Sequence, residues 1–109
     1  MKPLTRAEEE VMQILWQMER GFVKDMLEHM PNPKPAYNTV STIVRILERK
    51  GFVSHKSYGK SHEYFPIVSK AEYRTFIIKK MLDGYFDSSF KKLHEFFKND
   101  EALNTKEYQ

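Results

Sequence analysis

Near the start of the chain, apolar residues recur at the spacing of one face of an α-helix. The stripe has the spacing i, i+3, i+4 and i+7 and consists of Val11, Ile14, Leu15 and Met18. Thr5 and Glu8 precede it at the positions of a capping box, in which each side chain bonds the other residue's backbone N–H. The pattern predicts a core helix that begins at about Arg6 and stops near Gly21.

A second, shorter apolar pattern predicts a helix from Val23 to Met30. The residues expected to be buried are Val23, Met26, Leu27 and Met30. The segment 31–35 contains three prolines, which end this helix because proline lacks a backbone N–H and restricts the residue before it. A turn is therefore expected before the next helix.

The stretch from Ala36 to Gly51 carries two different stripes at helical spacing. The apolar stripe consists of Val40, Ile43, Val44 and Leu47, and the polar, basic stripe consists of Asn38, Ser41, Thr42, Arg45 and Arg49. Gly51 fits the position just beyond a helix, where a left-handed residue closes it. We interpret this stretch as a candidate DNA-recognition helix; the alternative is an ordinary amphipathic surface helix.

Two segments rich in aromatic and β-branched residues, 52–58 and 61–67, flank Gly59-Lys60 and predict a β-hairpin. Its tip is basic and rich in hydroxyl groups. Pro66 is expected at a strand end or edge, where its missing donor is harmless. The register stays open.

After the hairpin, Ser69 and Glu72 form a second capping box, which restarts helix. Two helices are expected, from about Lys70 to Asp83 and from about Asp87 to Lys98, with Gly84 as the interruption. Their large apolar side chains predict a contact with a second copy of the chain, although an aromatic-lined ligand cavity stays open as an alternative. The predicted dimerisation residues are Tyr73, Phe76, Ile77, Met81, Tyr85, Phe86, Phe90, Leu93 and Phe97. The mostly polar tail from Asn99 to Gln109 is expected to be partly ordered at best.

The 109 residues suit one small domain with an appended element. The absence of cysteine excludes disulfides and thiolate metal sites. No signal-peptide pattern and no apolar run near the ~20 residues of a membrane span are present. We therefore expect a cytoplasmic protein without membrane insertion.

Charge is concentrated in one part of the chain. The net charge is +3, but residues 34–61 hold six Lys and Arg residues against Glu48 alone, a local balance of +5. The rest of the chain therefore sums to −2. A positive field focused on the candidate recognition helix and the hairpin favours a polyanionic partner.

Other chemistry is not indicated. His55 and His62 lie on opposite strands and could be close, but no cysteine or carboxylate cluster completes a four-ligand metal site. No nucleophile arrangement and no Gly-rich phosphate loop is recognisable. We expect no enzyme activity, no metal and no cofactor.

The order of helix, helix, Pro-rich turn, polar helix and basic hairpin is that of a winged helix-turn-helix. Five segments carry more specific signatures: Leu4 to Met12 with Leu15-Trp16, Thr39 to Gly51, Gly59-Lys60, Tyr64-Phe65-Pro66 and Ser69 to Tyr73. On these segments the chain resembles the penicillinase and methicillin-resistance repressors, together with their copper-transport repressor relatives, from about Leu4 to Leu103.

This resemblance implies a mainly α fold with a small β-hairpin (α+β), in which residues 1–68 form a winged-helix DNA-binding domain and residues 69–109 a helical dimerisation region. It also implies a homodimeric repressor of dyad-symmetric operator DNA. In some members, a membrane sensor metalloprotease triggers release by cleavage within the dimerisation region. The predicted DNA-binding residues are Asn38, Thr39, Ser41, Thr42, Arg45, Arg49, Lys56, Ser57, Tyr58 and Lys60. The alternative function is a winged-helix interaction module that docks an acidic protein.

Overall fold

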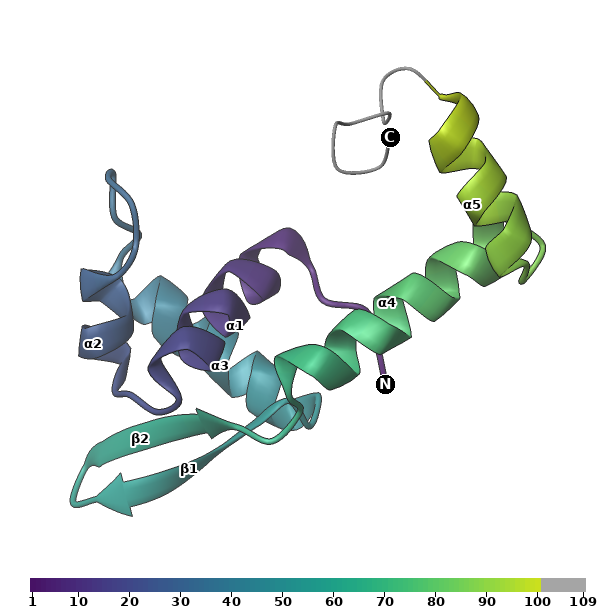
Figure 1. The fold of residues 1–109 in the computed structure, drawn as a ribbon. Helices are drawn as coiled ribbons and strands as arrows, with labels where there is room; N and C mark the ends of the chain where they lie inside the picture. Colours follow the sequence, from purple (N-terminus) through teal and green to yellow (C-terminus); the bar gives the residue numbers. More distant parts are fainter. Residues whose placement is uncertain (101–109) are drawn as a thin grey trace. The chain divides into compact units, whose positions relative to one another are not determined.

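A computed structural model describes residues 1–100 of the chain. The elements in order are α1 (Arg6–Met18), α2 (Val23–Glu28), α3 (Tyr37–Arg49), β1 (Val53–Tyr58), β2 (Ser61–Pro66), α4 (Lys70–Tyr85) and α5 (Phe90–Asn99) (Figure 1). The predicted α+β class, five helices with one antiparallel hairpin, is confirmed. The chain divides into two compact units, Met1–Tyr73 and Arg74–Gln109. Most of the predicted polar tail lies outside the described residues.

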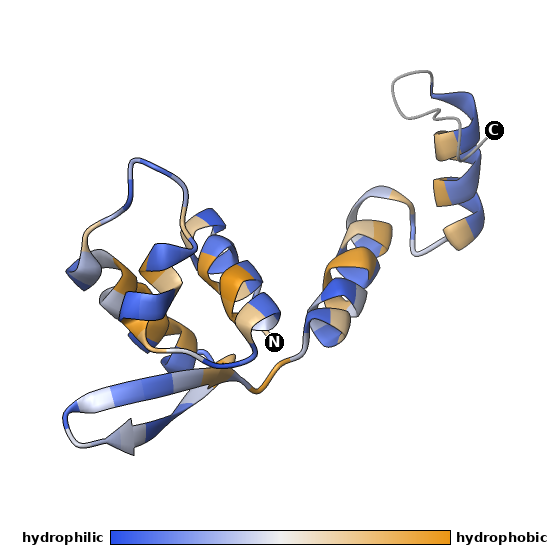
Figure 2. Cartoon of the chain, turned by 60° about the vertical axis from the view of Figure 1, so that its left-hand side comes forward, coloured by the Kyte–Doolittle hydropathy of each residue, from blue (hydrophilic) through white to orange (hydrophobic). Residues whose placement is uncertain are grey.

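The first unit has its core between α1, α2 and α3. Helices α1 and α3 pack against each other and against α2, and their hydrophobic parts turn toward one another (Figure 2). The fully buried side chains are Val11, Met12, Leu15, Met26, Val40, Val44, Leu47, Phe52 and Val53. The capping box at the start of α1 is present as predicted, with both the Thr5 and the Glu8 side chains bonded to backbone N–H groups.

Helix α2 is shorter than predicted. It ends at Glu28 rather than Met30, and Leu27 and Met30 are only half-buried. The reason lies in the Pro-rich segment, where Lys34 Nζ donates hydrogen bonds to the backbone oxygens of Leu27 and Glu28. These bonds satisfy carbonyls that the last turn of the helix leaves without partners.

The hairpin register, which the sequence left open, pairs Val53 with Pro66 and Tyr58 with Ser61. Gly59 begins the two-residue turn with φ +61°, a conformation that glycine adopts without strain. Pro66 lies at the end of β2, as predicted. A backbone bridge between Gly21 and Tyr64 ties β2 to the loop between α1 and α2.

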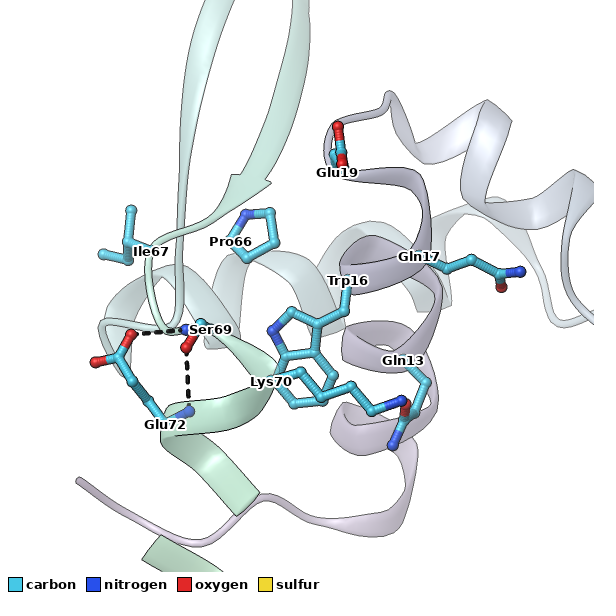
Figure 3. Close-up of a pocket in the computed structure, with 9 residues that line it drawn as sticks. All are labelled: Gln13, Trp16, Gln17, Glu19, Pro66, Ile67, Ser69, Lys70 and Glu72. Atoms are coloured by element: carbon cyan, nitrogen blue, oxygen red, sulfur yellow. Dashed lines mark hydrogen bonds between the residues drawn. The ribbon is translucent and has the colours of Figure 1, made fainter. Parts of the chain in front are cut away.

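The junction between β2 and α4 is built on the second predicted capping box. Ser69 N–H donates to Glu72 Oε1, and Glu72 N–H donates to Ser69 Oγ, each at 3.0 Å (Figure 3). Trp16 Nε1 donates to the backbone oxygen of Val68 at 2.9 Å. Trp16 also lines an open hollow of about 790 Å³ beside Pro66 and Ile67. These bonds fix the point at which α4 leaves the hairpin.

In the second unit, α4 runs through Gly84 to Tyr85, so the predicted interruption at Gly84 was wrong. A glycine weakens a helix by only about 1 kcal/mol, and the chain retains the bond from Phe86 N–H to the Leu82 oxygen. The break falls instead at Asp87 and Ser88, which adopt φ values of +51° and +58°. Ser89 then caps α5 by accepting a bond from Lys92 N–H, which moves the start of that helix to Phe90.

Candidate nucleic-acid interface

Helix α3 presents its predicted polar stripe to solvent. Val40, Val44 and Leu47 are buried on the opposite side. The predicted residues on this helix that are exposed are Asn38, Thr39, Thr42, Arg45 and Arg49, and Ser41 is half-buried. Because the apolar stripe fixes the rotation of the helix, these side chains share the outward face.

Two hydrogen bonds order side chains on this face. Thr42 Oγ1 donates to the Asn38 backbone oxygen at 2.8 Å, which leaves the hydroxyl oxygen able to accept. Arg45 donates from one terminal guanidinium nitrogen to Ser41 Oγ at 3.0 Å. A guanidinium has five N–H groups, so Arg45 keeps donors for a phosphate or a guanine edge.

The predicted wing residues Lys56, Ser57, Tyr58 and Lys60 are all exposed at the hairpin tip. Lys56 Nζ lies 5.3 Å from the centre of the Tyr58 ring, a cation–π distance. The Tyr58 ring in turn lies 6.0 Å from the ring of Phe22, which precedes α2. The aromatic contacts hold part of the basic tip close to the body of the first unit.

A hollow of about 880 Å³ is lined by residues of α3, of the hairpin and of the start of α2. Arg45, Tyr58 and Lys60 line it, as does Tyr64, which is buried below. Burial raises the pKa of the Tyr64 hydroxyl, and the negative charge of Glu48 raises it further. Tyr64 therefore stays a neutral hydrogen-bonding group at physiological pH.

Sequence reasoning missed two residues of this face. Tyr37, the first residue of α3, is 55% exposed although its spacing places it on the apolar stripe. Lys24 on α2 is exposed and lines the same hollow. Lys24 follows Val23 on a short helix that precedes the recognition stretch, and this position could have identified it. It was missed because only residues 34–61 were considered as the basic segment.

Two cations counted in the basic segment have other contacts. Lys50 Nζ lies 2.6 Å from Glu8 Oε1, so a carboxylate outside residues 34–61 balances its charge. Lys34 caps α2, as described above. The predicted cations that remain on the exposed face of α3 and the hairpin tip are Arg45, Arg49, Lys56 and Lys60.

The two strand histidines are close, as the sequence allowed. The rings of His55 and His62 stack with centres 4.1 Å apart and planes 9° apart. His55 Nδ1 also lies 2.8 Å from Glu48 Oε2. Within residues 1–100, no group of three or more His, Cys, Asp or Glu side chains is placed to hold a metal ion.

The predicted dimerisation residues fall into different environments. Tyr73 is 6% exposed and packs in the first unit, where its ring lies 5.6 Å from Phe52 and its hydroxyl accepts from Leu4 N–H at 2.8 Å. In the second unit Leu93 is buried, Phe76, Met81, Phe86 and Phe97 are half-buried, and Ile77, Tyr85 and Phe90 are exposed. Ile78 and Phe96 are also exposed, although neither is among the predicted dimerisation residues.

None of the helices described in residues 1–100 has the length and apolar character needed to cross a membrane.

Comparisons with known proteins agree on one family. A family model described as penicillinase repressor matches residues 4–109. The methicillin resistance regulatory protein MecI of Staphylococcus aureus (strain N315) is 24% identical over 107 residues, which cover 97% of this chain and 87% of that protein. The protein of the same name from Mammaliicoccus sciuri is 23% identical over the same lengths.

The fold also has a match among solved structures. The crystal structure of a possible transcriptional regulator for arsenical resistance aligns with a TM-score of 0.52 at 20% identity, over 76% of this chain and 91% of that chain. At this identity the match supports the fold alone. Because the family model spans nearly the whole sequence, the chain belongs to the penicillinase repressor family, a family of DNA-binding transcriptional repressors.

Proposed function

We propose that the chain is a homodimeric repressor that binds dyad-symmetric operator DNA, with α3 in the major groove and the hairpin as a basic wing. The observation that carries this proposal is the shared exposure of Asn38, Thr42 and Arg45 on the outward face of α3. Short polar side chains allow a helix backbone to approach base edges, and Arg45 supplies guanine or phosphate recognition. Asn38 has the amide geometry that reads adenine.

The roles of the remaining residues follow from their positions. Thr39 and Ser41 are hydroxyl donors near the start of α3, and Arg49 lies in its last turn, so all three suit phosphate contacts at the groove edges. Lys56, Ser57, Tyr58 and Lys60 at the tip suit the neighbouring backbone or minor groove. In this division, residues 1–68 bind DNA and residues 69–109 dimerise.

The proposed dimer surface uses the exposed apolar side chains of the second unit. Tyr85 is 84% exposed and Phe90 is 70% exposed, on either side of the turn between α4 and α5. Large apolar side chains left in water favour association with a second copy. Tyr73 is omitted from this surface because it is already packed in the first unit. A membrane sensor metalloprotease, which the family resemblance implies as a source of the inducing signal, stays a prediction.

The test is a mobility shift of the full chain with DNA from upstream of its own gene, measured over a series of salt concentrations. Each phosphate contact is expected to contribute a slope of about −0.9 to the plot of log K against log salt. An unrelated duplex of equal length serves as the control and should bind more weakly. Failure to bind any duplex at low salt would contradict the proposal and favour a module that docks an acidic protein.

A further inference from the structure

A side-chain bridge connects the DNA-facing helix to the wing. Glu48 lies in the last turn of α3, and its two carboxylate oxygens lie 2.8 and 3.0 Å from His55 Nδ1 on β1. His62 on β2 stacks on His55 at 4.1 Å. The bridge therefore runs from α3 through one strand of the hairpin to the other.

We propose that Glu48, His55 and His62 form a joint that sets the angle of the wing against α3, so that the wing tip and the helix meet one DNA duplex together. These three are positioning residues, because they act through Arg45 on the helix and Lys60 on the tip. The inference rests on the proposed function, since it concerns how the same surface is arranged for DNA.

The place of the joint in the hairpin supports this role. The Gly21–Tyr64 backbone bridge holds β2 from the side of the α1–α2 loop. The Glu48–His55 hydrogen bond holds β1 from the side of α3. The two strands are thus tied to different helical parts of the first unit, and the exposed tip begins directly after His55 at Lys56. A small rotation of the hairpin at His55 therefore moves the tip by a larger distance.

Two of the three side chains of the joint are partly withdrawn from water. The side chains of His55 and Glu48 are 27% and 32% exposed, whereas His62 is exposed. The Tyr64 ring lies 5.5 Å from His55 and 6.2 Å from His62 and supports the stack from beside it. A hydrogen bond to a carboxylate is stronger where water is partly excluded than where both groups are fully exposed.

The joint lies at a hollow that other charged side chains also line. The other charged or titratable groups that line the surrounding hollow are Lys24 and Asp25 from α2, Tyr37 and Arg45 from α3, and Tyr58, Lys60 and Tyr64 from the hairpin.

A double-mutant cycle tests whether the joint exists, without any DNA. Glu48→Gln, His55→Asn and the double variant are made in the full chain, and unfolding by urea is followed at pH 7. The coupling between the two sites should change the unfolding equilibrium constant by about threefold or more. Additive effects of the two substitutions would overturn the proposal.

Binding measurements test whether the joint positions the wing. The probe is the duplex that the wild-type chain selects from a random-sequence pool, compared with an unselected duplex. If Glu48 acted only as a local negative charge, Glu48→Gln would strengthen binding to both duplexes. If the joint positions the wing, Glu48→Gln should instead lower the affinity for the selected duplex by about threefold to tenfold. It should cause no loss of affinity for the unselected duplex.

Glu63→Gln is the matched control, because it removes a carboxylate from β2 opposite Lys56 and leaves α3 untouched. It should change binding to the two duplexes equally. If Glu48→Gln behaves like Glu63→Gln on both duplexes, the positioning role is overturned. If the wild-type chain selects no duplex, the proposed function fails, the positioning role fails with it, and the cycle alone decides whether the bridge couples α3 to the hairpin.

Discussion

Lys50 Nζ, at the C-terminal end of α3, donates a 2.6 Å hydrogen bond to Glu8 Oε1 at the N-terminal end of α1. The same oxygen accepts from Thr5 N–H at 2.9 Å. Burial by itself would raise the pKa of the Glu8 carboxyl, but the bonds from Lys50 and Thr5 and the positive charge of Lys50 hold it below its usual value of 4.5. One buried carboxylate therefore both caps α1 and fixes the end of the helix assigned to DNA contact.

Glu8→Gln should lower the free energy of unfolding at pH 7 by about 2 kcal/mol, because it leaves Lys50 without its charge partner. The folded-state pKa lies below the unfolded value, so this stabilisation is fully present above about pH 4.5 and is lost as the pH falls through the folded-state pKa. Urea unfolding between pH 3 and 7 measures it. Glu9→Gln, at an exposed position in the same turn, is the control and should change stability by about 0.5 kcal/mol or less. Equal effects of the two variants would refute a stabilising role for the Glu8–Lys50 contact.

Arg45→Ala should weaken binding to the preferred duplex by roughly 1–3 kcal/mol and relax base preference, because the proposed binding mode places this guanidinium at a base edge. Lys60→Ala should weaken binding to all duplexes alike and reduce the salt slope by about one unit, because the proposed binding mode places this exposed lysine at a phosphate. Competition titrations with matched and random duplexes separate the two. Indistinguishable profiles would argue against this division between helix and wing.

The double variant Tyr85→Asp, Phe90→Asp should abolish the proposed dimer, because two charges would lie in its apolar contact. Sedimentation of the full chain measures the change in mass. Lys91→Asp is the control, since its side chain is exposed next to Phe90 and also gains an acidic group. A dimer that survives the double variant would show that the contact lies elsewhere.

Tyr73→Ala should lower the free energy of unfolding by about 3 kcal/mol, because the ring packs on Trp16 and Phe52 and its hydroxyl accepts a backbone bond. Tyr85→Ala, at a position 84% exposed, should leave the free energy of unfolding of the first unit unchanged. Chemical denaturation followed by Trp16 fluorescence reports on the first unit. The reverse order of effects would place Tyr73 in the dimer contact after all.

Much of this fold could be predicted from local patterns in the sequence. Both Ser or Thr capping boxes, the buried stripe of α3 and the glycine turn of the hairpin depend on residues within one or two turns of each other. Such features follow from backbone chemistry and helical period. The outward face of α3 could therefore be predicted from its sequence alone.

Features set by distant contacts could not be predicted. Nothing in the spacing of Tyr73 distinguishes a residue of the first core from one on an exposed helix face, because both follow the same helical period. The charge of Lys50 was assigned to the candidate interface because its partner lies 42 residues away. Tyr37 was not predicted as part of the exposed face, because its helical spacing coincides with that of the buried stripe, yet it is 55% exposed.

The measurement that bears most directly on the central claim is a hydroxyl-radical footprint of the full chain on its selected duplex. A dimer that places one α3 in each of two half-sites predicts two protected regions related by a dyad, with centres one helical turn, about 34–36 Å, or a multiple of it apart. Arg45→Ala should weaken both regions together. A single protected region without symmetry, or no protection at low salt, would contradict the account.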